Sequence, residues 1–316
     1  MRAHQRHLCN MEATKILHPE GRDAHLPLRR KGAHGTVRRL WRDRAAFLGL
    51  AVILCTALAA VFAPELSPTD PIKNNLLERL TPPMWSPGGT SSYPLGTDTL
   101  GRDVLSRLLY GARISLLVGV SAVAISSVLG VSLGLIAGYY GGWLDDVLMR
   151  LGDIQLAFPI LVLAIAVLAV LGASLGNVIL VLGISGWITL ARIARGETLS
   201  LKEREFVEAA RAIGLSDRGI LWQHILPNVL SSITVVATFS VARVIIAEAS
   251  LSFLGLGVPP PTPSWGAMLD EGRNYITTAW WLALFPGLAI LILVLGINLV
   301  GDWMRDILDP RMERGI

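Results

Sequence analysis

The sequence predicts an all-α membrane protein with six transmembrane helices. Charged residues make up 16% of the 316 residues, whereas soluble domains contain about 25%. The ranges 114–144, 154–191 and 274–301 contain no Asp, Glu, Lys or Arg, and each exceeds the roughly 20 residues that a helix needs to cross a bilayer. These observations argue against a soluble enzyme, a disordered chain and a nucleic-acid-binding protein, even though the net charge is +4.

The first part of the chain is a basic segment. Residues 1–44 contain 11 Lys or Arg against 4 Asp or Glu, and such a polar composition predicts a largely disordered tail. Because cations favour the cytoplasmic side, we expect this tail in the cytoplasm. The uncharged range 45–63 is long enough for the first transmembrane helix. Residues 64–112 contain seven prolines and are expected to form an extracytoplasmic loop or insert.

Five further helices are predicted to form a core over residues 113–302. The boundaries follow from the uncharged runs and from the turn-forming sequence GASLGN at 172–177. The predicted helices are 114–138, 154–171, 178–195, 229–247 and 281–301. Residues 303–316 are expected to form a second cytoplasmic tail. With both termini in the cytoplasm, most Lys and Arg lie on that side, in agreement with the positive-inside rule.

Small residues recur every fourth position along the predicted helix 114–138. They are Ala122, Ser126, Gly130, Gly134 and Gly138. A face of this kind allows two helix backbones to approach closely. It predicts either packing within the bundle, which is the commoner case, or contact with a partner.

The charged segment 203–227 is predicted to be a cytoplasmic helix–turn–helix. Gly214 follows a run of helix formers and is suited to the left-handed conformation that ends a helix. Ser216 or Asp217 can cap the next helix. Ala209 and Ala210 have little side chain and leave room for a closely docked partner. The alternative is a helix pair that lies on the lipid headgroups of the membrane.

Three sequence motifs resemble those of one family. Glu208-Ala209-Ala210, then three residues and Gly214, ends at HILP (224–227); this pattern resembles the signature of permease subunits of ATP-binding cassette importers. PLGTDTLGRD (94–103) and LSFLGLG (251–257) resemble the peptide-type branch, which transports dipeptides, oligopeptides or nickel. His224 replaces the usual Ile, as in the peptide-importing members. The chain is most similar to the dipeptide-C and oligopeptide-C type.

The resemblance implies a fold, partners and a mechanism. The fold is that of a type I importer permease with both termini in the cytoplasm. Dipeptides or oligopeptides would cross the bacterial cytoplasmic membrane by alternating access. The implied partners are a second homologous permease, two cytoplasmic ATPase subunits and an extracytoplasmic peptide-binding protein. The residues implied to couple to the ATPase are Glu208, Ala209, Ala210, Gly214, Leu226 and Pro227.

The predicted outer loop carries the charged residues Asp98, Arg102 and Asp103. One interpretation is that they meet the binding protein or control the entrance of the transport path. The other is that they form local ion pairs that fix the loop, and exposed pairs of this kind contribute only about 0–1 kcal/mol. The residues alone do not decide between these two interpretations.

Arg243 is the one charged residue in the predicted helix 229–247. An arginine at a helix centre costs about 2.5–3.5 kcal/mol on insertion scales. We place Arg243 near the outer end of this helix, where it can reach the interface or pair with Glu248. Because charges within a membrane often lie on a transport path, both residues are candidates for lining it.

Other functions are not supported by residue patterns. None of the four lysines (Lys15, Lys31, Lys73 and Lys202) follows a glycine, so the chain has no Walker A loop. We therefore expect no enzyme activity and no cofactor in this chain, with ATP and Mg²⁺ bound by the ATPase subunits. We also expect no metal site, because His224 is the only histidine outside the tail. The remaining alternatives are a nickel or metal-chelate importer permease and a stand-alone secondary transporter or channel.

Overall fold

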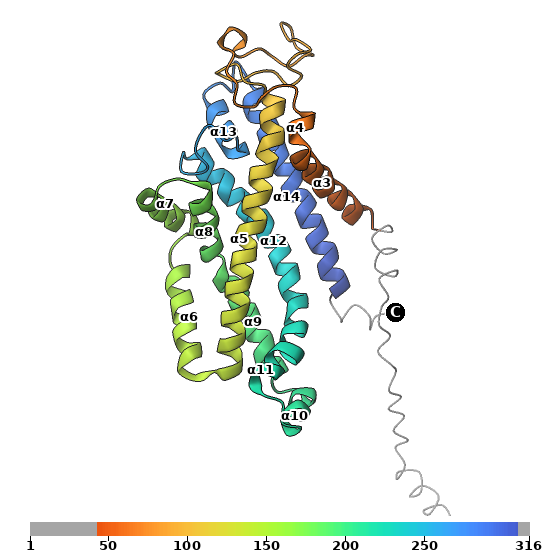
Figure 1. Ribbon diagram of the computed structural model, residues 1–316, viewed down its shortest axis with the longest axis vertical. Coiled ribbons are helices and arrows are strands. Elements are labelled where there is room, and N and C mark those ends of the chain that lie inside the picture. The colour runs from red at the N-terminus through yellow and green to blue at the C-terminus, as the bar shows by residue number, and fades with distance from the viewer. Residues whose placement is uncertain (1–42, 309–316) are drawn as a thin grey trace, which may run out of the picture. The chain divides into compact units, whose positions relative to one another are not determined.

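The computed structural model describes residues 43–308, which form a bundle of helices (Figure 1). Nearly all of the predicted tail 1–44 and residues 309–316 of the second tail lie outside the described residues. The helices are α3 (Arg44–Val61), α4 (Ala63–Leu66), α5 (Val104–Tyr140), α6 (Gly142–Leu156), α7 (Ile160–Leu171), α8 (Leu175–Ser185), α9 (Trp187–Leu201), α10 (Glu205–Ala212), α11 (Asp217–Ile220), α12 (Leu226–Phe253), α13 (Trp265–Arg273) and α14 (Trp281–Leu308), with a 3₁₀ turn at Leu76–Glu78 and a π-helical turn at Leu221–Ile225.

The number of membrane spans agrees with the prediction. Within residues 43–308, five helices are long and apolar enough to cross a membrane, and there are six if the bent pair α6 and α7 counts as one span. α8 and α9 together form one such helix, Leu175–Leu201, and α11 to α12 form another, Asp217–Phe253.

The predicted helix 114–138 is ten residues longer at its N-terminus. α5 begins at Val104, because the side chain of Asp103 caps it by accepting from the backbone N–H of Ser106. The prediction stopped at Arg113, since charge was taken to end the membrane helix. Arg107 lies in the first turns of α5 with its charge buried and paired, so a charged residue does not mark the helix end here. The predicted loop 64–112 is correspondingly shorter.

Two other predicted boundaries are wrong for reasons that involve proline. The predicted helix 154–171 crosses the junction of two helices: its first three residues end α6, its last twelve form α7, and the two helices meet at an angle of 87° beside Pro159. Conversely, Pro227 does not interrupt α12. Helix 229–247 was predicted to begin after Pro227, but the helix continues from Asp217 through the π-helical turn. The carbonyl of His224 accepts a hydrogen bond from the Asn228 side chain (2.6 Å).

The small residues of α5 pack inside this chain. All of them are buried, and α5 makes its most extensive helix contact with α9. A Cβ atom added at Gly130 would lie 2.5 Å from the carbonyl oxygen of Trp187, which is closer than Cβ atoms approach in proteins. The interpretation as packing within the bundle is therefore confirmed.

α3 packs against α14 through two glycines. A Cβ atom at Gly49 would lie 2.6 Å from the carbonyl oxygen of Gly296, and one at Gly296 would lie 2.9 Å from Val52. The two helices run in opposite directions (Figure 1). The N-terminal end of α3 and the C-terminal end of α14 therefore lie on the same side of the bundle.

The two ends of the bundle have different structures (Figure 1). One end carries residues 67–103 and α13, and we call it the loop end. The other carries α10, α11 and the turn between α5 and α6, and we call it the α10 end. α13 was not predicted from the sequence.

Candidate functional site

α10 is a short helix that stands out at the α10 end of the bundle (Figure 1). Glu205 and Glu208 lie in its first turn and Arg211 in its last. This distribution complements the helix dipole, which is positive at the N-terminus and negative at the C-terminus. The residues thus favour a separate helix at the position predicted from the sequence.

Gly214 ends α10 as predicted. Its φ angle is +85°, a left-handed conformation that glycine adopts without steric cost. The N–H of Gly214 donates to the carbonyl of Arg211 (3.0 Å), and the N–H of Leu215 donates to that of Ala210 (3.1 Å). These two bonds form a Schellman motif. Ser216 then caps α11, as its side chain accepts from the N–H of Gly219.

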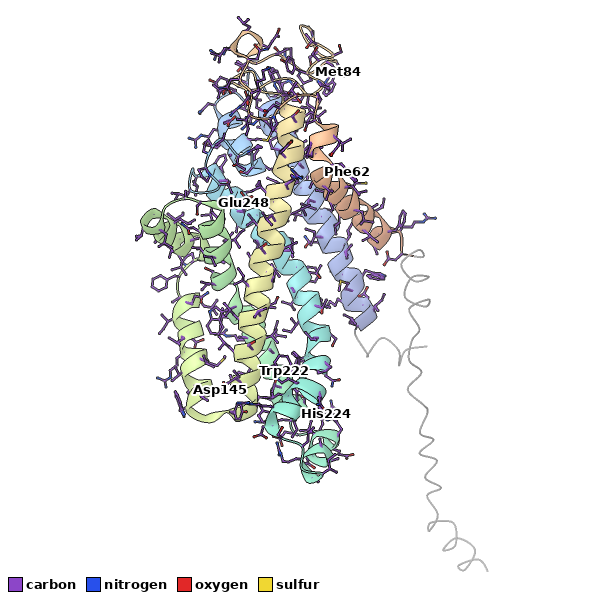
Figure 2. The ribbon with its side chains drawn as sticks, viewed as in Figure 1. Phe62, Met84, Asp145, Trp222, His224 and Glu248 are labelled. Atoms are coloured by element: carbon purple, nitrogen blue, oxygen red, sulfur yellow. The ribbon has the colours of Figure 1, made fainter. Side chains whose placement is uncertain are left out.

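A buried cluster holds α10 against the next helix. Val207 and Ala210 of α10 pack with residues of α11, the π-helical turn and α12, including Ile220 and Ile225. The ring of Phe206 lies against that of His224, with 6.3 Å between centroids. His224 and Trp222 both lie at this end (Figure 2). α10 is therefore attached to the start of the long helix that contains α12.

Two hydrogen bonds connect this segment to the end of α5. The hydroxyl of Tyr139 donates to a carboxylate oxygen of Asp217 (2.6 Å). The ammonium group of Lys202, just before α10, donates to the carbonyl of Gly138 (3.2 Å). The segment predicted to couple to a partner thus contacts both α5 and α12.

The outer face of α10 is partly apolar and exposed. Ile213 is 85% exposed and Phe206 is 42% exposed. Ala209, Glu208 and Gly214 are exposed beside them. We call these five residues the α10 patch. Exposed apolar side chains on a projecting helix are typical of a protein contact surface.

The other predicted coupling residues lie outside the α10 patch. Ala210 is only 4% exposed and packs in the buried cluster, so the two adjacent alanines face opposite ways. Leu226 is half-buried against the same cluster. Pro227 is exposed in the first turn of α12. Sequence alone did not distinguish the outward-facing alanine from the inward-facing one.

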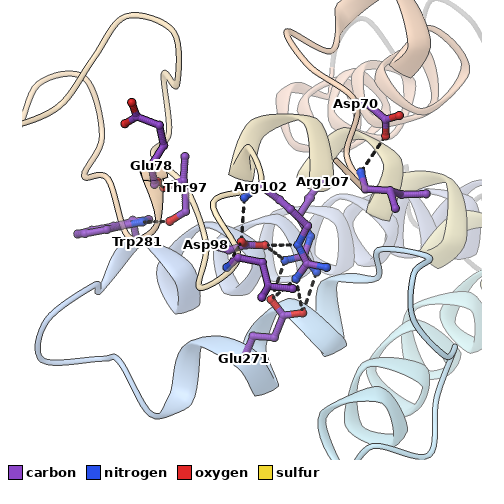
Figure 3. A network of polar contacts seen from close by, with 10 residues as sticks. Asp70, Glu78, Thr97, Asp98, Arg102, Arg107, Glu271 and Trp281 are labelled. Carbon is purple, nitrogen blue, oxygen red and sulfur yellow. Dashed lines mark hydrogen bonds and ion pairs between the residues drawn. The ribbon is translucent and has the colours of Figure 1, made fainter. Parts of the chain in front are cut away.

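The loop end contains a buried network of charges (Figure 3). Asp98 accepts hydrogen bonds from the side chains of Arg102 (2.7 Å) and Arg107. Glu271 of α13 also binds both arginines, with Nη2 of Arg102 at 3.1 Å and Nη2 of Arg107 at 2.9 Å. Asp98 is 1% exposed and the arginines are below 10%. The network joins residues 98–107 to α13.

Asp103 does not belong to this network. One of its oxygens caps α5 by accepting from the N–H (2.8 Å) and the hydroxyl (2.6 Å) of Ser106. Burial raises the pKa of Asp103 above that of an ordinary aspartate, and the hydrogen bonds from Ser106 oppose this rise. Asp98, Arg102 and Asp103 are all buried, so this arrangement favours the interpretation that they fix the loop.

Two of the four charged residues in the network, Arg107 and Glu271, were not predicted from the sequence. Arg107 lies nine residues after Asp98, and Glu271 is 164 residues further along the chain. Arg107 carries a local signal, because it follows Asp98, Arg102 and Asp103 within one short charged stretch. Glu271 carries none, since nothing near it indicates its distant partners.

Arg243 and Glu248 are separate in the structure. Because α12 continues to Phe253, Arg243 lies ten residues from the helix end, which corrects its predicted place. It lines a cavity and donates to the hydroxyl of Ser240 (3.0 Å). Glu248 is fully buried, accepts from the hydroxyl of Ser252 (2.7 Å) and lines no cavity that contains Arg243. No ion pair joins the two residues in the described part of the chain.

Residues 43–308 contain no group of three or more His, Cys, Asp or Glu side chains arranged to hold a metal ion.

Comparison with known protein families identifies the family to which the chain belongs. The family described as "Binding-protein-dependent transport system inner membrane component" matches residues 130–314, which is more than half of the chain. The chain is a permease of this family. A second family, "N-terminal TM domain of oligopeptide transport permease C", matches residues 34–83. The permease is thus a multi-pass component of the inner membrane and not an enzyme. Members of this family work with an ATPase, a substrate-binding protein and a second permease.

Curated relatives are similar over most of the permease. The dipeptide transport system permease protein DppC of Alkalihalophilus pseudofirmus is 43% identical over 87% of this chain and 89% of its own. The di/tripeptide transport system permease protein DppC of Pseudomonas aeruginosa is 44% identical over 86% and 89%. The glutathione transport system permease protein GsiD of Pectobacterium atrosepticum is 44% identical over 90% and 95%. The family resemblance predicted from the motifs is confirmed.

A solved structure supports the fold. The MetNI methionine ABC transporter, described in inward-facing conformations, matches with a TM-score of 0.52 and 19% identity. The match covers 64% of the permease and 96% of the other chain. The predicted type I importer permease fold is therefore confirmed.

Proposed function

We propose that the permease is one of two membrane subunits of an ATP-driven importer for short peptides, which it moves by alternating access. The observation that carries this proposal is the α10 patch, an exposed apolar surface fixed to the transmembrane helices by a buried cluster. A cytoplasmic ATPase subunit would bind the patch. Both chain termini would then be cytoplasmic, because the N-terminal end of α3 and the C-terminal end of α14 lie on the same side of the bundle. The loop end would face the binding protein on the opposite side of the membrane.

The connections of α10 suggest how movement at the ATPase reaches the transport path. The buried cluster joins α10 to the helix Asp217–Phe253, and Tyr139 joins Asp217 to α5. Both α5 and α12 line the cavity that contains Arg243. A displacement of α10 would therefore act on two walls of this cavity at once. ATP binding would shift the population between two arrangements of these helices.

The names of the relatives support peptides as the cargo. Those reported above are permeases for dipeptides, for di- and tripeptides and for glutathione, which is itself a tripeptide. Because these relatives are about 44% identical over nearly the whole chain, a similar cargo class is the best-supported proposal here. The nickel alternative has no support from an observation of this kind, and family membership argues against a stand-alone transporter or channel.

Substitution of Ala209 tests the proposed function. The permease would be assembled with its second permease, ATPases and binding protein in liposomes, and ATP-dependent uptake of trialanine measured. Ala209→Trp fills the middle of the α10 patch, so we expect uptake to fall at least tenfold and the ATPase subunits to dissociate more readily during purification. Ala45→Trp is the matched control, because Ala45 is an exposed alanine in the first turn of α3.

The control variant should transport trialanine at the wild-type rate. Normal uptake by Ala209→Trp would show that the ATPase does not use the α10 patch. Failure of the wild-type complex to take up any short peptide would contradict the proposed cargo, while retained binding of the ATPases would leave the importer assignment intact.

A further inference from the structure

A cavity of about 390 Å³ opens between α5, α6 to α9 and α12. Its volume is within the range of about 300–1,000 Å³ that is usual for small-molecule sites. Val123 and Ser126 form part of its wall and lie near the middle of the 37-residue helix α5. The cavity is therefore near the middle of the membrane spans. Most of its lining is apolar, with Arg243 as the only charged residue.

Three other polar side chains of the lining, those of Ser126, Ser185 and Gln155, already have partners. The hydroxyls of Ser126 and Ser185 each donate to a backbone carbonyl at 2.6 Å. The Gln155 side chain donates to the carbonyl of Ser185 (2.6 Å) and accepts from the indole N–H of Trp187 (2.7 Å). These groups stabilise the wall and have little capacity left for a ligand.

Arg243 differs from them because most of its donors are free. A guanidinium group has five N–H donors, and the one hydrogen bond from Arg243 goes to Ser240 on its own helix. Its side chain is exposed to the cavity. Among the described residues, no acidic side chain pairs with Arg243, whereas Arg102, Arg107 and Arg195 all have such partners.

An unpaired cation within a membrane span is costly, so its presence indicates a function. An anion that can enter the cavity would supply the missing partner. The planar guanidinium group matches a carboxylate, which it can bind through two parallel hydrogen bonds. Every linear peptide has a C-terminal carboxylate, whatever its side chains. A receptor for this group would accept many peptide sequences.

We propose that Arg243 binds the C-terminal carboxylate of the transported peptide as it passes through the membrane. This inference rests on the proposed function and adds the chemical group that the transport path recognises. An acidic residue of the second permease is the other anion that could meet Arg243, and the experiment distinguishes the two.

The test compares two peptides that differ only at the carboxylate. Uptake of trialanine and of trialanine amide would be measured in liposomes that contain the complete transporter. Each peptide is supplied at a concentration that saturates the binding protein, as determined beforehand from its Kd. The variants are Arg243→Gln, Arg243→Lys and the control Arg113→Gln. Arg113 is an exposed arginine of α5 that lies outside the cavity.

We expect the wild type and Arg113→Gln to transport trialanine about 10- to 100-fold faster than its amide, which is the range expected for hydrogen bonds to a charged group. Arg243→Gln should transport the two peptides at equal, low rates. Arg243→Lys keeps the charge but not the planar fork, so it should retain part of the preference.

Three results would overturn the inference. The first is undiminished trialanine uptake by Arg243→Gln, and the second is an equal loss for both peptides with the preference retained. The third is loss of the second permease from purified Arg243→Gln and Arg243→Lys complexes, which would show that the arginine pairs with that subunit. A wild-type complex that transports neither peptide contradicts the proposed function and, with it, this inference.

Discussion

The two ends of the permease differ in whether their charged and apolar side chains are buried or exposed. At the loop end, Asp98, Arg102, Arg107 and Glu271 are close together and largely buried, and each charge has an opposite partner. At the α10 end, Glu208 is exposed and Ile213 presents an apolar side chain to solvent. At the loop end, every charge of the network finds its partner within this chain. The α10 end leaves a surface that only a partner would cover.

This difference indicates separate roles for the two ends. Paired buried charges hold residues 98–107 and α13 in a single arrangement, because separating them would leave charges without partners in a poorly solvated place. At the α10 end, the cluster that holds α10 in place is buried, whereas the α10 patch is exposed. Three substitutions test this comparison, and the largest effect is expected at the loop end.

Asp98→Ala should cause the largest loss of stability. It leaves Arg102 and Arg107 with only Glu271 as an acidic partner, and breaking a buried pair costs about 3–5 kcal/mol. The measurement is chemical unfolding in detergent, followed by tryptophan fluorescence. Asp70→Ala is the control, because Asp70 is an exposed aspartate of the same end that accepts one backbone hydrogen bond.

We expect Asp70→Ala to change the free energy of unfolding by less than about 1 kcal/mol, as for other exposed surface sites. Equal effects of the two substitutions would remove the distinction between the two ends. Loss of uptake by Asp98→Ala without loss of stability would restore the hypothesis that Asp98 acts directly in substrate entry.

Gly214→Ala should have an intermediate effect that stays local to α10. An L-residue in the left-handed conformation costs about 1–2 kcal/mol, and φ at Gly214 is +85°. Amide hydrogen exchange at the end of α10 should accelerate roughly 5- to 30-fold as a result. The matched control is Gly196→Ala within α9. At both positions an added Cβ would meet nothing within 4 Å, but only Gly214 has a positive φ.

Because alanine is favoured over glycine inside a helix by about 1 kcal/mol, Gly196→Ala should slow exchange or leave it unchanged. Similar acceleration in both variants would mean that the Schellman motif contributes nothing special to the position of α10.

Tyr139→Phe should have the smallest effect on stability and a visible one on coupling. It removes one hydrogen bond to Asp217, worth about 0.5–1.5 kcal/mol. We expect about two- to tenfold fewer peptides transported per ATP hydrolysed, measured in proteoliposomes. Tyr140→Phe is the control, since Tyr140 is the neighbouring exposed tyrosine and stacks edge-on with Tyr139. A coupling ratio unaffected by Tyr139→Phe would exclude this bond as a route to α5.

Sequence predicted the spans and the α10 turn well, because both depend on local properties. Uncharged runs identify membrane helices, and Gly214 ends a helix for reasons within its own backbone. The errors occurred where distant residues decide. Arg107 stays inside a helix because Asp98 and Glu271 neutralise it, so charge did not mark the start of α5.

Prolines gave ambiguous signals for the same reason. Pro159 separates two helices at a sharp angle, whereas Pro227 lies within a continuous helix, just after the π-helical turn and in the first turn of α12. The opposite orientations of Ala209 and Ala210 depend on which face of α10 meets the cluster around Ile220. These outcomes follow from tertiary packing, which a single sequence does not display.

The continuous helix Asp217–Phe253 has a mechanical consequence. Its 37 residues, at a rise of 1.5 Å each, make a rod roughly 55 Å long. A tilt of about 5° about one end would displace the other by roughly 5 Å over that length. The π-helical turn and Pro227 lie close to the end attached to α10, and there the regular backbone bonding is interrupted. The departure from regular helix bonding therefore lies next to the point where force would enter, and the regular helix beyond it extends past Arg243.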